Sequence, residues 1–327
     1  MAKVLGMGNA LVDIMTKLIN DETLKHFNLP KGSMQLVDHV KSGEINSGTD
    51  HLEKQLASGG SAANTIHGLA KLDIETGFIG KVGDDELGNY FHKDMEKNKI
   101  KPLLLKSKTP SGKAMALISP DSERTFATFL GAAVELSPED ILPEHFDGFN
   151  YFHIEGYLVQ NHALIEKAVM LAKEKGLTVT LDMASYNVVE ENLEFLQNIL
   201  TNYVDIVFAN EEEAKAFTGK EPEQALNDFA ELCDIAVVKV GKKGSMVKRG
   251  GNTFNIKSID AKSVDTTGAG DLYAAGFIYG LIKGYSLDKC GSIGSVLAGK
   301  TIEVVGPKME EHKWEEVKEM VNDLLGN

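Results

Sequence analysis

Short apolar runs alternate with helical patterns along most of the chain. We predict buried strands at residues 4–5, 77–79, 151–154, 178–181, 206–208 and 235–238. Helical patterns follow several of these runs, at residues 162–175, 211–218 and 222–232. In the last of them Ala225, Phe229 and Leu232 recur at i, i+4 and i+7, the spacing of one helix face. Strands alternating with helices predict βαβ units and a mostly parallel sheet covered on both faces, which is the α/β class.

Two regions, residues 12–48 and 111–130, depart from this alternation. Within the second, residues 113–119 and 125–129 have the composition of adjacent strands around a turn at 120–123. A hairpin without an intervening helix does not belong in a sheet of βαβ units, so we expect these regions to form a small β lid over a site. The predicted large domain comprises the remaining residues, 1–11, 49–110 and 131–327.

Composition narrows the classes of function. The 327 residues include 43% hydrophobic and 25% charged residues, which is ordinary for a globular protein, and carry a formal net charge of −14. Nucleic acid and anionic membranes would repel this charge, so neither is an expected partner, whereas a local site for a small anionic substrate is compatible with it. No window resembles a signal peptide or a membrane span, and we expect a cytoplasmic protein. Cys233 and Cys290 lack metal-site spacing and are expected to be buried, unpaired thiols.

A glycine-rich segment, Asp265-Thr-Thr-Gly-Ala-Gly-Asp271, precedes an apolar helical run at residues 272–282. The amides of Gly268, Ala269 and Gly270 at a helix N-terminus would form an anion-binding concavity, strengthened by the helix dipole. Asp271 would then lie where an acceptor hydroxyl meets a transferring phosphoryl group. The alternative is that Asp271 only caps the helix and the glycines only make a turn.

Two further segments follow predicted strands and could contact a nucleotide. Lys239-Val-Gly241-Lys-Lys-Gly244 places a lysine before a glycine turn, although a charged hairpin turn would look the same. Asn210 and Glu213 open a helix, where acidic residues are common for dipole reasons or could organise hydrated Mg²⁺. The Walker pattern and the G-x-G-x-x-G dinucleotide pattern are both absent, which argues against a P-loop kinase and a Rossmann dehydrogenase.

Candidate acceptor-binding residues lie in the N-terminal part of the chain. Gly59-Gly60-Ser-Ala-Ala-Asn64 opens a helix, and its glycines would let a ligand approach the backbone. Asn9 and Asp13 follow the first predicted strand and could bind the hydroxyls of a ribose or sugar. Loop asparagines and aspartates that bond only to their own backbone are the alternative.

Taken together and in this order, the two glycine-rich segments resemble the N- and C-terminal signatures of the ribokinase-like (pfkB) carbohydrate kinase family. Within the family the chain is most similar to the adenosine kinases. That similarity is carried by residues 6–14, 34–37 and 203–214 and by the long spacer between Asp13 and Gly59. The resemblance implies a three-layer α/β/α sandwich with a β lid and an enzyme that uses ATP and Mg²⁺, with K⁺ as a further candidate.

The resemblance also implies roles for individual residues. It implies Asp271 as base, the 268–270 amides as anion hole, and Arg124 as a lid arginine that reaches the phosphates. The implied acceptor-binding residues are Asn9, Asp13, Gln35, Gly59, Gly60 and Asn64. The implied nucleotide-binding residues are Asn210, Glu213, Lys239, Gly241, Gly244, Thr266, Gly268 and Gly270. Glu213 would bind Mg²⁺ through water, and Asp265 and Thr267, with residues 305–306, would bind a monovalent cation.

We therefore expect phosphorylation of the 5′-hydroxyl of a ribonucleoside, adenosine being the leading candidate. A purine would need apolar or aromatic walls, for which the available side chains are Leu11, Gln35, Leu36, Phe129 and Tyr157. A ribokinase or fructokinase acting on a free sugar is the alternative within catalysis, and a non-catalytic nucleoside or sugar sensor is the alternative outside it. The lid strands could pair between subunits or cover the site within one chain, so both a monomer and a homodimer are open.

Overall fold

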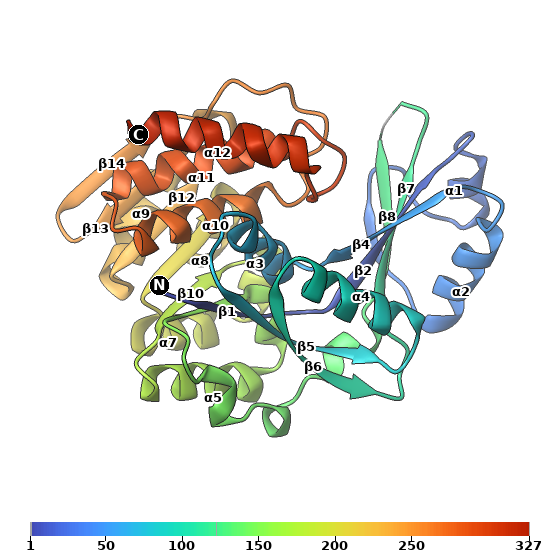
Figure 1. The fold of residues 1–327 in the computed structure, drawn as a ribbon, viewed down its shortest axis with the longest axis horizontal. Coiled ribbons are helices and arrows are strands. Elements are labelled where there is room, and N and C mark those ends of the chain that lie inside the picture. The colour runs from blue at the N-terminus through green and yellow to red at the C-terminus, as the bar shows by residue number, and fades with distance from the viewer. Residues whose placement is uncertain (1, 122, 327) are drawn as a thin grey trace.

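A large, mostly parallel sheet forms the centre of the molecule (Figure 1). The structure, a computed structural model, describes residues 2–121 and 123–326. Within this part of the chain the sheet has nine strands in the order β14-β13-β12-β11-β10-β9-β1-β5-β6, and only β13 and β14 run antiparallel to their neighbours. The strands are β1 (Val4–Met7), β5 (Thr76–Gly83), β6 (Ile100–Ser107), β9 (Tyr151–Glu155), β10 (Thr178–Asp182), β11 (Ile206–Asn210), β12 (Ile235–Lys239), β13 (Ser245–Arg249) and β14 (Asn252–Ile256).

Helices cover both faces of this sheet and produce three layers. One face is covered by α5 (His162–Glu174), α6 (Tyr186–Glu191), α7 (Leu193–Asn202), α8 (Glu211–Thr218) and α9 (Pro222–Leu232). The other face is covered by α3 (Ser61–Lys71), α4 (Glu86–Lys97), α10 (Ala269–Ile282), α11 (Leu287–Thr301) and α12 (Glu311–Leu325). The predicted α/β architecture is confirmed.

Alternation along the strands explains why these segments read as continuous apolar runs. In β11, Val207 and Ala209 enter the hydrophobic core on one face, while Ile206 and Phe208 enter the core on the other. Successive side chains of a strand point to opposite faces, so a strand buried on both faces is apolar at most positions. The buried thiols of Cys233 and Cys290 are unpaired, as predicted. Among the described residues no helix has the length and apolar character of a membrane span.

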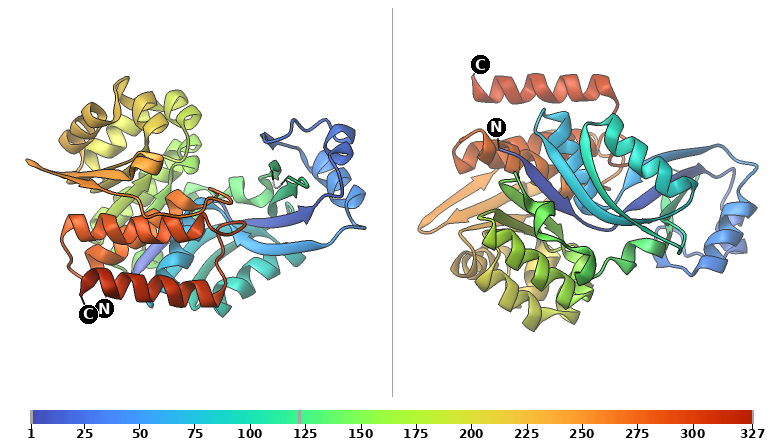
Figure 2. Two further views of the ribbon diagram at one scale, coloured as in Figure 1. Left: turned by 90° about the horizontal axis from the view of Figure 1, so that it is seen from above. Right: turned by 60° about the horizontal axis from the view of Figure 1, so that its bottom comes forward.

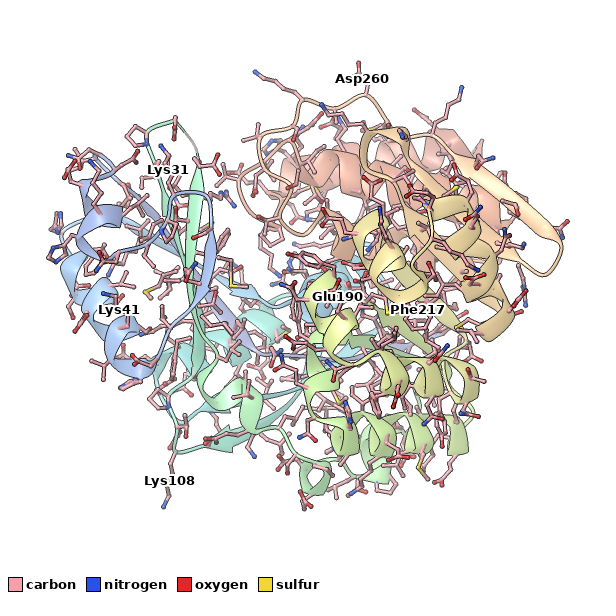
Figure 3. All side chains as sticks on the ribbon, turned by 180° about the vertical axis from the view of Figure 1, so that it is seen from behind. Lys31, Lys41, Lys108, Glu190, Phe217 and Asp260 are labelled. Atoms are coloured by element: carbon pink, nitrogen blue, oxygen red, sulfur yellow. The ribbon has the colours of Figure 1, made fainter. Side chains whose placement is uncertain are left out.

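A second, smaller sheet stands beside the large one, with the order β3-β8-β7-β2-β4 (Figure 2). Its strands are β2 (Leu11–Lys17), β3 (Met34–Leu36), β4 (Lys54–Gly59), β7 (Gly112–Ile118) and β8 (Arg124–Phe129). We call residues 11–59 and 112–129 the small domain. Figure 3 shows it from behind, with Lys31 and Lys41 on it and Asp260 on the large domain.

The small domain has a hydrophobic core of its own. Its two helices, α1 (Glu22–His26) and α2 (His39–Gly48), bring Leu24 and Ile45 against Ile14 and Leu117 on one face of the small sheet. The opposite face of the sheet carries a different set of side chains and looks toward the large domain. One face is therefore structural and the other is available to a ligand.

The predicted hairpin is confirmed, but the small sheet is larger than the predicted lid of residues 12–48 and 111–130. β7 and β8 pair antiparallel, as expected. β4 lies in the segment assigned to the large domain, yet it pairs antiparallel with β2 from Leu11↔Gly59 to Thr16↔Lys54. Leu56 is the only large apolar residue of β4, so the strand has no hydrophobic alternation to reveal it and is defined by its pairing with β2.

Candidate active site

A cavity of about 1390 Å³ lies between the carboxyl ends of the large sheet and the inner face of the small one. Its size exceeds the roughly 300–1,000 Å³ of a site for one small molecule, so it has room for two ligands. The lining includes residues from both glycine-rich segments, from the strand ends and from the small domain. In open parallel sheets, ligands bind at the carboxyl ends of the strands, and this cavity follows that rule.

Polar side chains occupy the carboxyl ends of four neighbouring strands. Glu155 on β9 is the register partner of Asp182 on β10, and Asn210 on β11 is the register partner of Lys239 on β12. Parallel pairing thus brings residues from distant parts of the sequence to one edge of the sheet. The loop after β1 adds Asn9 to the same edge.

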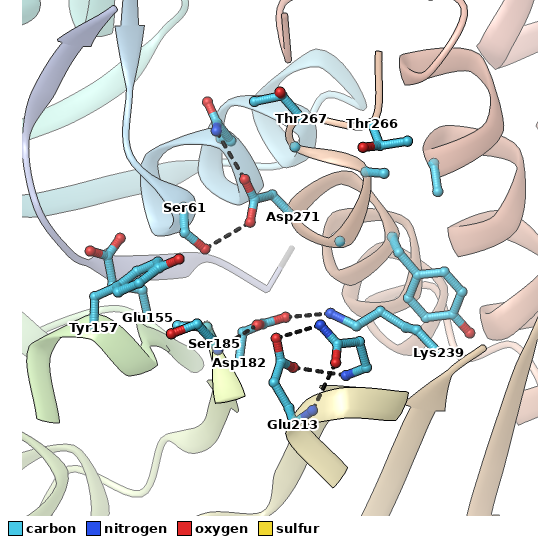
Figure 4. Close-up of a pocket in the computed structure, with 18 of the residues that line it drawn as sticks. Ser61, Glu155, Tyr157, Asp182, Ser185, Glu213, Lys239, Thr266, Thr267 and Asp271 are labelled. Carbon is cyan, nitrogen blue, oxygen red and sulfur yellow. Dashed lines mark hydrogen bonds and ion pairs between the residues drawn. The ribbon is translucent and has the colours of Figure 1, made fainter. Parts of the chain in front are cut away.

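Asp271 lies in the first turn of α10 and contacts the first turn of α3 (Figure 4). Its Oδ1 accepts a hydrogen bond from Ser61 Oγ at 2.7 Å, and its Oδ2 accepts one from Asn64 Nδ2 at 2.9 Å. The helix N-cap is Gly268, and Asp271 makes no capping bond. The interpretation of Asp271 as a simple helix cap is therefore wrong, because its carboxylate is directed away from its own helix end.

The environment of Asp271 shifts its proton affinity. Burial raises the pKa of Asp271 from 3.8 to about 6, and the hydrogen bonds from Asn64 and Ser61 oppose this rise. The negative charge of Asp182 raises the pKa further, while the positive charge of Lys239 lowers it. A carboxylate with a pKa near 6 is ionised at neutral pH and is a stronger proton acceptor than an ordinary aspartate.

Free backbone amides surround the start of α10. Gly268 has φ +76°, and a Cβ there would lie 2.4 Å from Pro307 Cβ, so the position requires glycine. The amide of Ala269 donates to the Thr266 carbonyl at 3.2 Å. Within the described residues, the amides of Gly268 and Gly270 have no backbone or side-chain acceptor. The amides of Gly268 and Gly270 are thus free for the predicted anion hole, whereas the Ala269 amide is used in the turn.

Lys239 lies between these free amides and a group of buried carboxylates. Its Nζ forms an ion pair of 2.8 Å with Asp182 Oδ2, and a Cβ added at Gly270 would lie 3.0 Å from that Nζ. Burial and the neighbouring Asp182 raise the pKa of Glu213. Asn210 and Glu213 form a reciprocal capping box, in which the Asn210 amide N–H donates to Glu213 Oε2 at 2.8 Å. This arrangement places a cation, two carboxylates and free amides within one edge of the cavity.

The acceptor end is organised by Glu155, which is almost completely buried. Glu155 Oε1 accepts from the Asn9 backbone N–H at 2.9 Å and from Asn9 Nδ2 at 2.8 Å, and its Oε2 accepts from the Ala62 amide at 2.9 Å. Burial raises the pKa of Glu155 to about 7. Burial likewise raises the pKa of Asp13 to about 7, although Lys308 and Arg124 lower it. The side-chain oxygens Asn9 Oδ1 and Asn64 Oδ1 lack protein donors within the described part of the chain.

Alternate residues of the small sheet form one wall of the cavity. On β3 the residues that line it are Met34 and Leu36, and on β8 they are Phe126 and Thr128. Gln35, predicted to bind the acceptor, lies between the two lining residues of β3 and points the other way, toward Ser33 Oγ. Phe129, a predicted wall residue, likewise faces outward and contacts the His39 ring at a centroid distance of 5.5 Å. Alternate residues of a strand face the cavity. Which alternate set does so is decided by the strand pairing, which the sequence does not reveal.

The other predicted residues divide into three groups. Those that line the cavity are Leu11, Asp13, Tyr157, Gly60, Asn64, Glu213, Gly241, Gly244, Thr266, Thr267 and Gly268 to Asp271. Gly59 lies behind the lining, where a Cβ would come within 2.5 Å of the Asp13 carboxylate. Arg124 and Asp265 form an ion pair with each other across the boundary between the two domains.

Sequence reasoning missed Ser61, Glu155 and Asp182. Ser61 was inside a recognised motif but was not assigned a contact. Glu155 and Asp182 each follow an apolar run that was correctly predicted as a strand. A carboxylate at the carboxyl end of a parallel strand is the signal that would have identified both.

Comparisons with known proteins show which family the chain is similar to. The family model described as pfkB family carbohydrate kinase matches residues 35–313. The adenosine kinase of Saccharomyces cerevisiae is 30% identical over 339 residues, covering 95% of this chain and 98% of the yeast protein.

Two solved structures share the fold over nearly the whole chain. The adenosine kinase of Sinorhizobium meliloti superposes with a TM-score of 0.86 at 33% identity, covering 98% of this chain and 99% of that one. A probable sugar kinase from Rhizobium etli superposes with a TM-score of 0.87 at 32% identity, covering 98% of both chains.

Proposed function

The chain belongs to the pfkB family of carbohydrate kinases and is therefore a phosphotransferase with an alcohol acceptor; from this premise we propose that it phosphorylates the 5′-hydroxyl of a ribonucleoside, adenosine, with ATP as donor. The observation that supports a nucleoside is the apolar wall of the cavity that also contains Asp13 and Glu155. Met34, Leu36 and Val134 line the cavity and are more than half exposed without ligand. A free sugar offers nothing to cover these side chains, whereas a purine ring does.

The shape of the cavity supports the same acceptor. Asn9, Asp13 and Asn64 lie at its polar end, where they would bind ribose hydroxyls, and Tyr157 lies beside Glu155 with its ring in the cavity (Figure 4). An aromatic ring next to an apolar wall suits a flat heterocycle, because stacking covers both faces of the base. The ribose would then point its primary hydroxyl toward Asp271.

The geometry of the first turn of α10 supports phosphoryl transfer. Asp271 accepts the proton of the 5′-hydroxyl as the new O–P bond forms and the bond to ADP breaks. The Gly268 and Gly270 amides, the helix dipole and Lys239 stabilise the charge on the transferring group. Ser61 and Asn64 hold the carboxylate in place, so each of its oxygens keeps a fixed direction.

Mg²⁺ would bind the donor phosphates beside Asp182 and Glu213. Mg²⁺ usually retains several waters and needs one or two carboxylates, and the mutual repulsion of these two buried carboxylates is what a cation would relieve. When bound, the ion would neutralise charge on the transferring phosphate. The described residues hold no group of three or more acidic, histidine or cysteine ligands, so binding through water and phosphate fits better than a protein cage.

The proposal is tested by measuring ADP formation with adenosine, inosine, guanosine, ribose and fructose as acceptors in ATP and Mg²⁺. We expect the highest kcat/KM with a nucleoside and the lowest with free sugars. Activity confined to ribose or fructose would show instead that the chain is a sugar kinase and that the apolar wall does not bind a base.

A further inference from the structure

One cation of the small domain is buried against the large domain. Arg124, at the start of β8, pairs its Nη1 with Asp265 Oδ2 at 2.5 Å, and only 9% of its side chain is exposed. Arg124 and Arg249 are the arginines of the chain, and all its other cationic side chains are lysines or histidines. Arg249 also pairs with an aspartate, Asp234, but 55% of its side chain is exposed. The chain thus places an arginine where the two domains meet.

Asp265 has no oxygen left for another ligand. Its Oδ1 accepts from the Thr267 amide at 3.1 Å and from Thr267 Oγ1 at 2.8 Å. Its Oδ2 accepts from the Gly306 amide at 2.6 Å and pairs with Arg124. A carboxylate offers about four acceptor positions, and all four are used.

The predicted monovalent-cation site at Asp265 and Thr267 therefore does not fit this structure. A cation such as K⁺ binds through oxygen atoms, and both carboxylate oxygens of Asp265 already receive protein donors. The guanidinium of Arg124 supplies the positive charge that such an ion would bring. Binding K⁺ at this carboxylate would first require Arg124 to leave.

We propose that Arg124 is the built-in cation of this site, so that catalysis proceeds without a monovalent cation. The inference rests on the kinase activity but not on the identity of the acceptor. The charge acts through the loop from Asp265 to Gly270, whose far end carries the anion-hole amides. Pro307, next to the Gly306 amide, packs against Gly268 and links the paired carboxylate to that end of the loop. Arg124 is thus a positioning residue that the small domain contributes to the large one.

The other charges near Arg124 indicate which carboxylate would lose its cation if Arg124 were replaced. Asp13 is the further carboxylate that interacts with the guanidinium, and Lys308 also faces Asp13. Removing Arg124 would leave Asp13 with one cation and Asp265 with none. The missing positive charge should therefore be felt at Asp265, where a small cation could replace it.

The test compares wild type, Arg124→Ala, Arg124→Lys and the matched control Arg249→Ala in KCl, NaCl and choline chloride at equal ionic strength. For wild type and Arg249→Ala, both kcat and Tm should be the same in KCl and choline chloride. For Arg124→Ala, kcat in choline should fall about tenfold or more, as expected when a buried charge loses its partner, and KCl should restore it. The Tm of Arg124→Ala should rise with KCl in a saturable way, and Arg124→Lys should show a smaller dependence.

Two results would overturn the inference. One is a wild-type enzyme that requires K⁺, and the other is an Arg124→Ala variant whose kcat and Tm do not respond to any cation. If Arg124→Ala does not fold, the wild-type comparison and Arg124→Lys still decide the question. The thermal measurement needs no acceptor, so a failure of the nucleoside assignment leaves this test intact.

Discussion

At the scale of single residues, the proposed reaction depends on one carboxylate held by two hydrogen bonds. Ser61 and Asn64 belong to the helix that opens the acceptor end, and Asp271 belongs to the helix that opens the phosphate end. The same contacts therefore orient the proposed proton acceptor and join the first turns of α3 and α10. Asn64 has two roles in this arrangement. Its side-chain nitrogen donates to Asp271, and its side-chain oxygen is left for a ligand.

Replacing Asp271 by Asn should lower kcat by about 10²–10⁴, the usual contribution of a positioned general base. The KM values for ATP and acceptor should change little, since the amide keeps the size of the carboxylate. Steady-state kinetics with purified Asp271→Asn measures both quantities. Near-normal kcat would contradict the assignment of Asp271 as base.

The pH dependence should follow the raised pKa of Asp271. With acceptor saturating, so that Asp13 is engaged, kcat/KM for ATP should fall as pH drops through about 6, because protonation removes the base. An aspartate with its ordinary pKa of ~3.9 would lose activity only at lower pH.

This fall of kcat/KM at low pH is the acidic limb of the pH profile. Two variants should shift the acidic limb in opposite directions. Asp182→Asn removes a negative charge that raises the pKa of Asp271, so the limb should shift to lower pH. Lys239→Met removes a positive charge that lowers this pKa, so the limb should shift to higher pH. Equal shifts in one direction would mean that another group controls the limb.

At the scale of elements, the alternation of β3 and β8 sets the specificity of the cavity. Leu36→Asn should raise KM for a nucleoside about tenfold, equivalent to roughly 1.4 kcal/mol of lost apolar contact. Gln35→Ala is the matched control, since the neighbouring side chain faces away from the cavity. Acceptor titrations of both variants measure the difference, and equal effects would show that the face of β3 has been misassigned.

Much of the large domain could be predicted because its strands carry their own signal. The run at 235–238 and the helix at 222–232 appear in the structure almost as expected, as β12 and α9. The strand β4 and the choice of which β3 residues face the cavity could not be predicted. Both depend on pairing with distant strands rather than on local composition. In the site, Gly60, Asn64 and Asp271 line one cavity as expected. Asp182 and Glu155 are brought side by side by the register of β9 and β10, although their position at the carboxyl ends of predicted strands is a signal that the sequence contains.

At the scale of the whole molecule, each face of the small sheet, in the part of the chain that the structure describes, is either covered by helices or turned toward the cavity. One face lines the cavity, and α1 and α2 cover the other with buried contacts such as Phe27. A net charge of −14 also opposes close association of two copies. We therefore expect a monomer of 35.5 kDa, which sedimentation equilibrium measures directly. A stable dimer would mean that association uses a surface other than the small sheet.

The separate hydrophobic core of the small domain has a consequence for how new substrate preferences arise. Because Ile14, Leu117 and Ile45 stabilise this unit from within, its ligand-facing strands can accumulate mutations without weakening the scaffold that carries Asp271. Under the proposed function, the apolar part of acceptor recognition lies in the small domain and the chemistry at phosphorus lies in the large one, so the two can diverge at different rates. A chimaera that grafts residues 11–59 and 112–129 of a sugar-specific relative onto this scaffold, with Arg124 retained, should shift the acceptor preference while keeping Asp271 and its hydrogen bonds to Ser61 and Asn64.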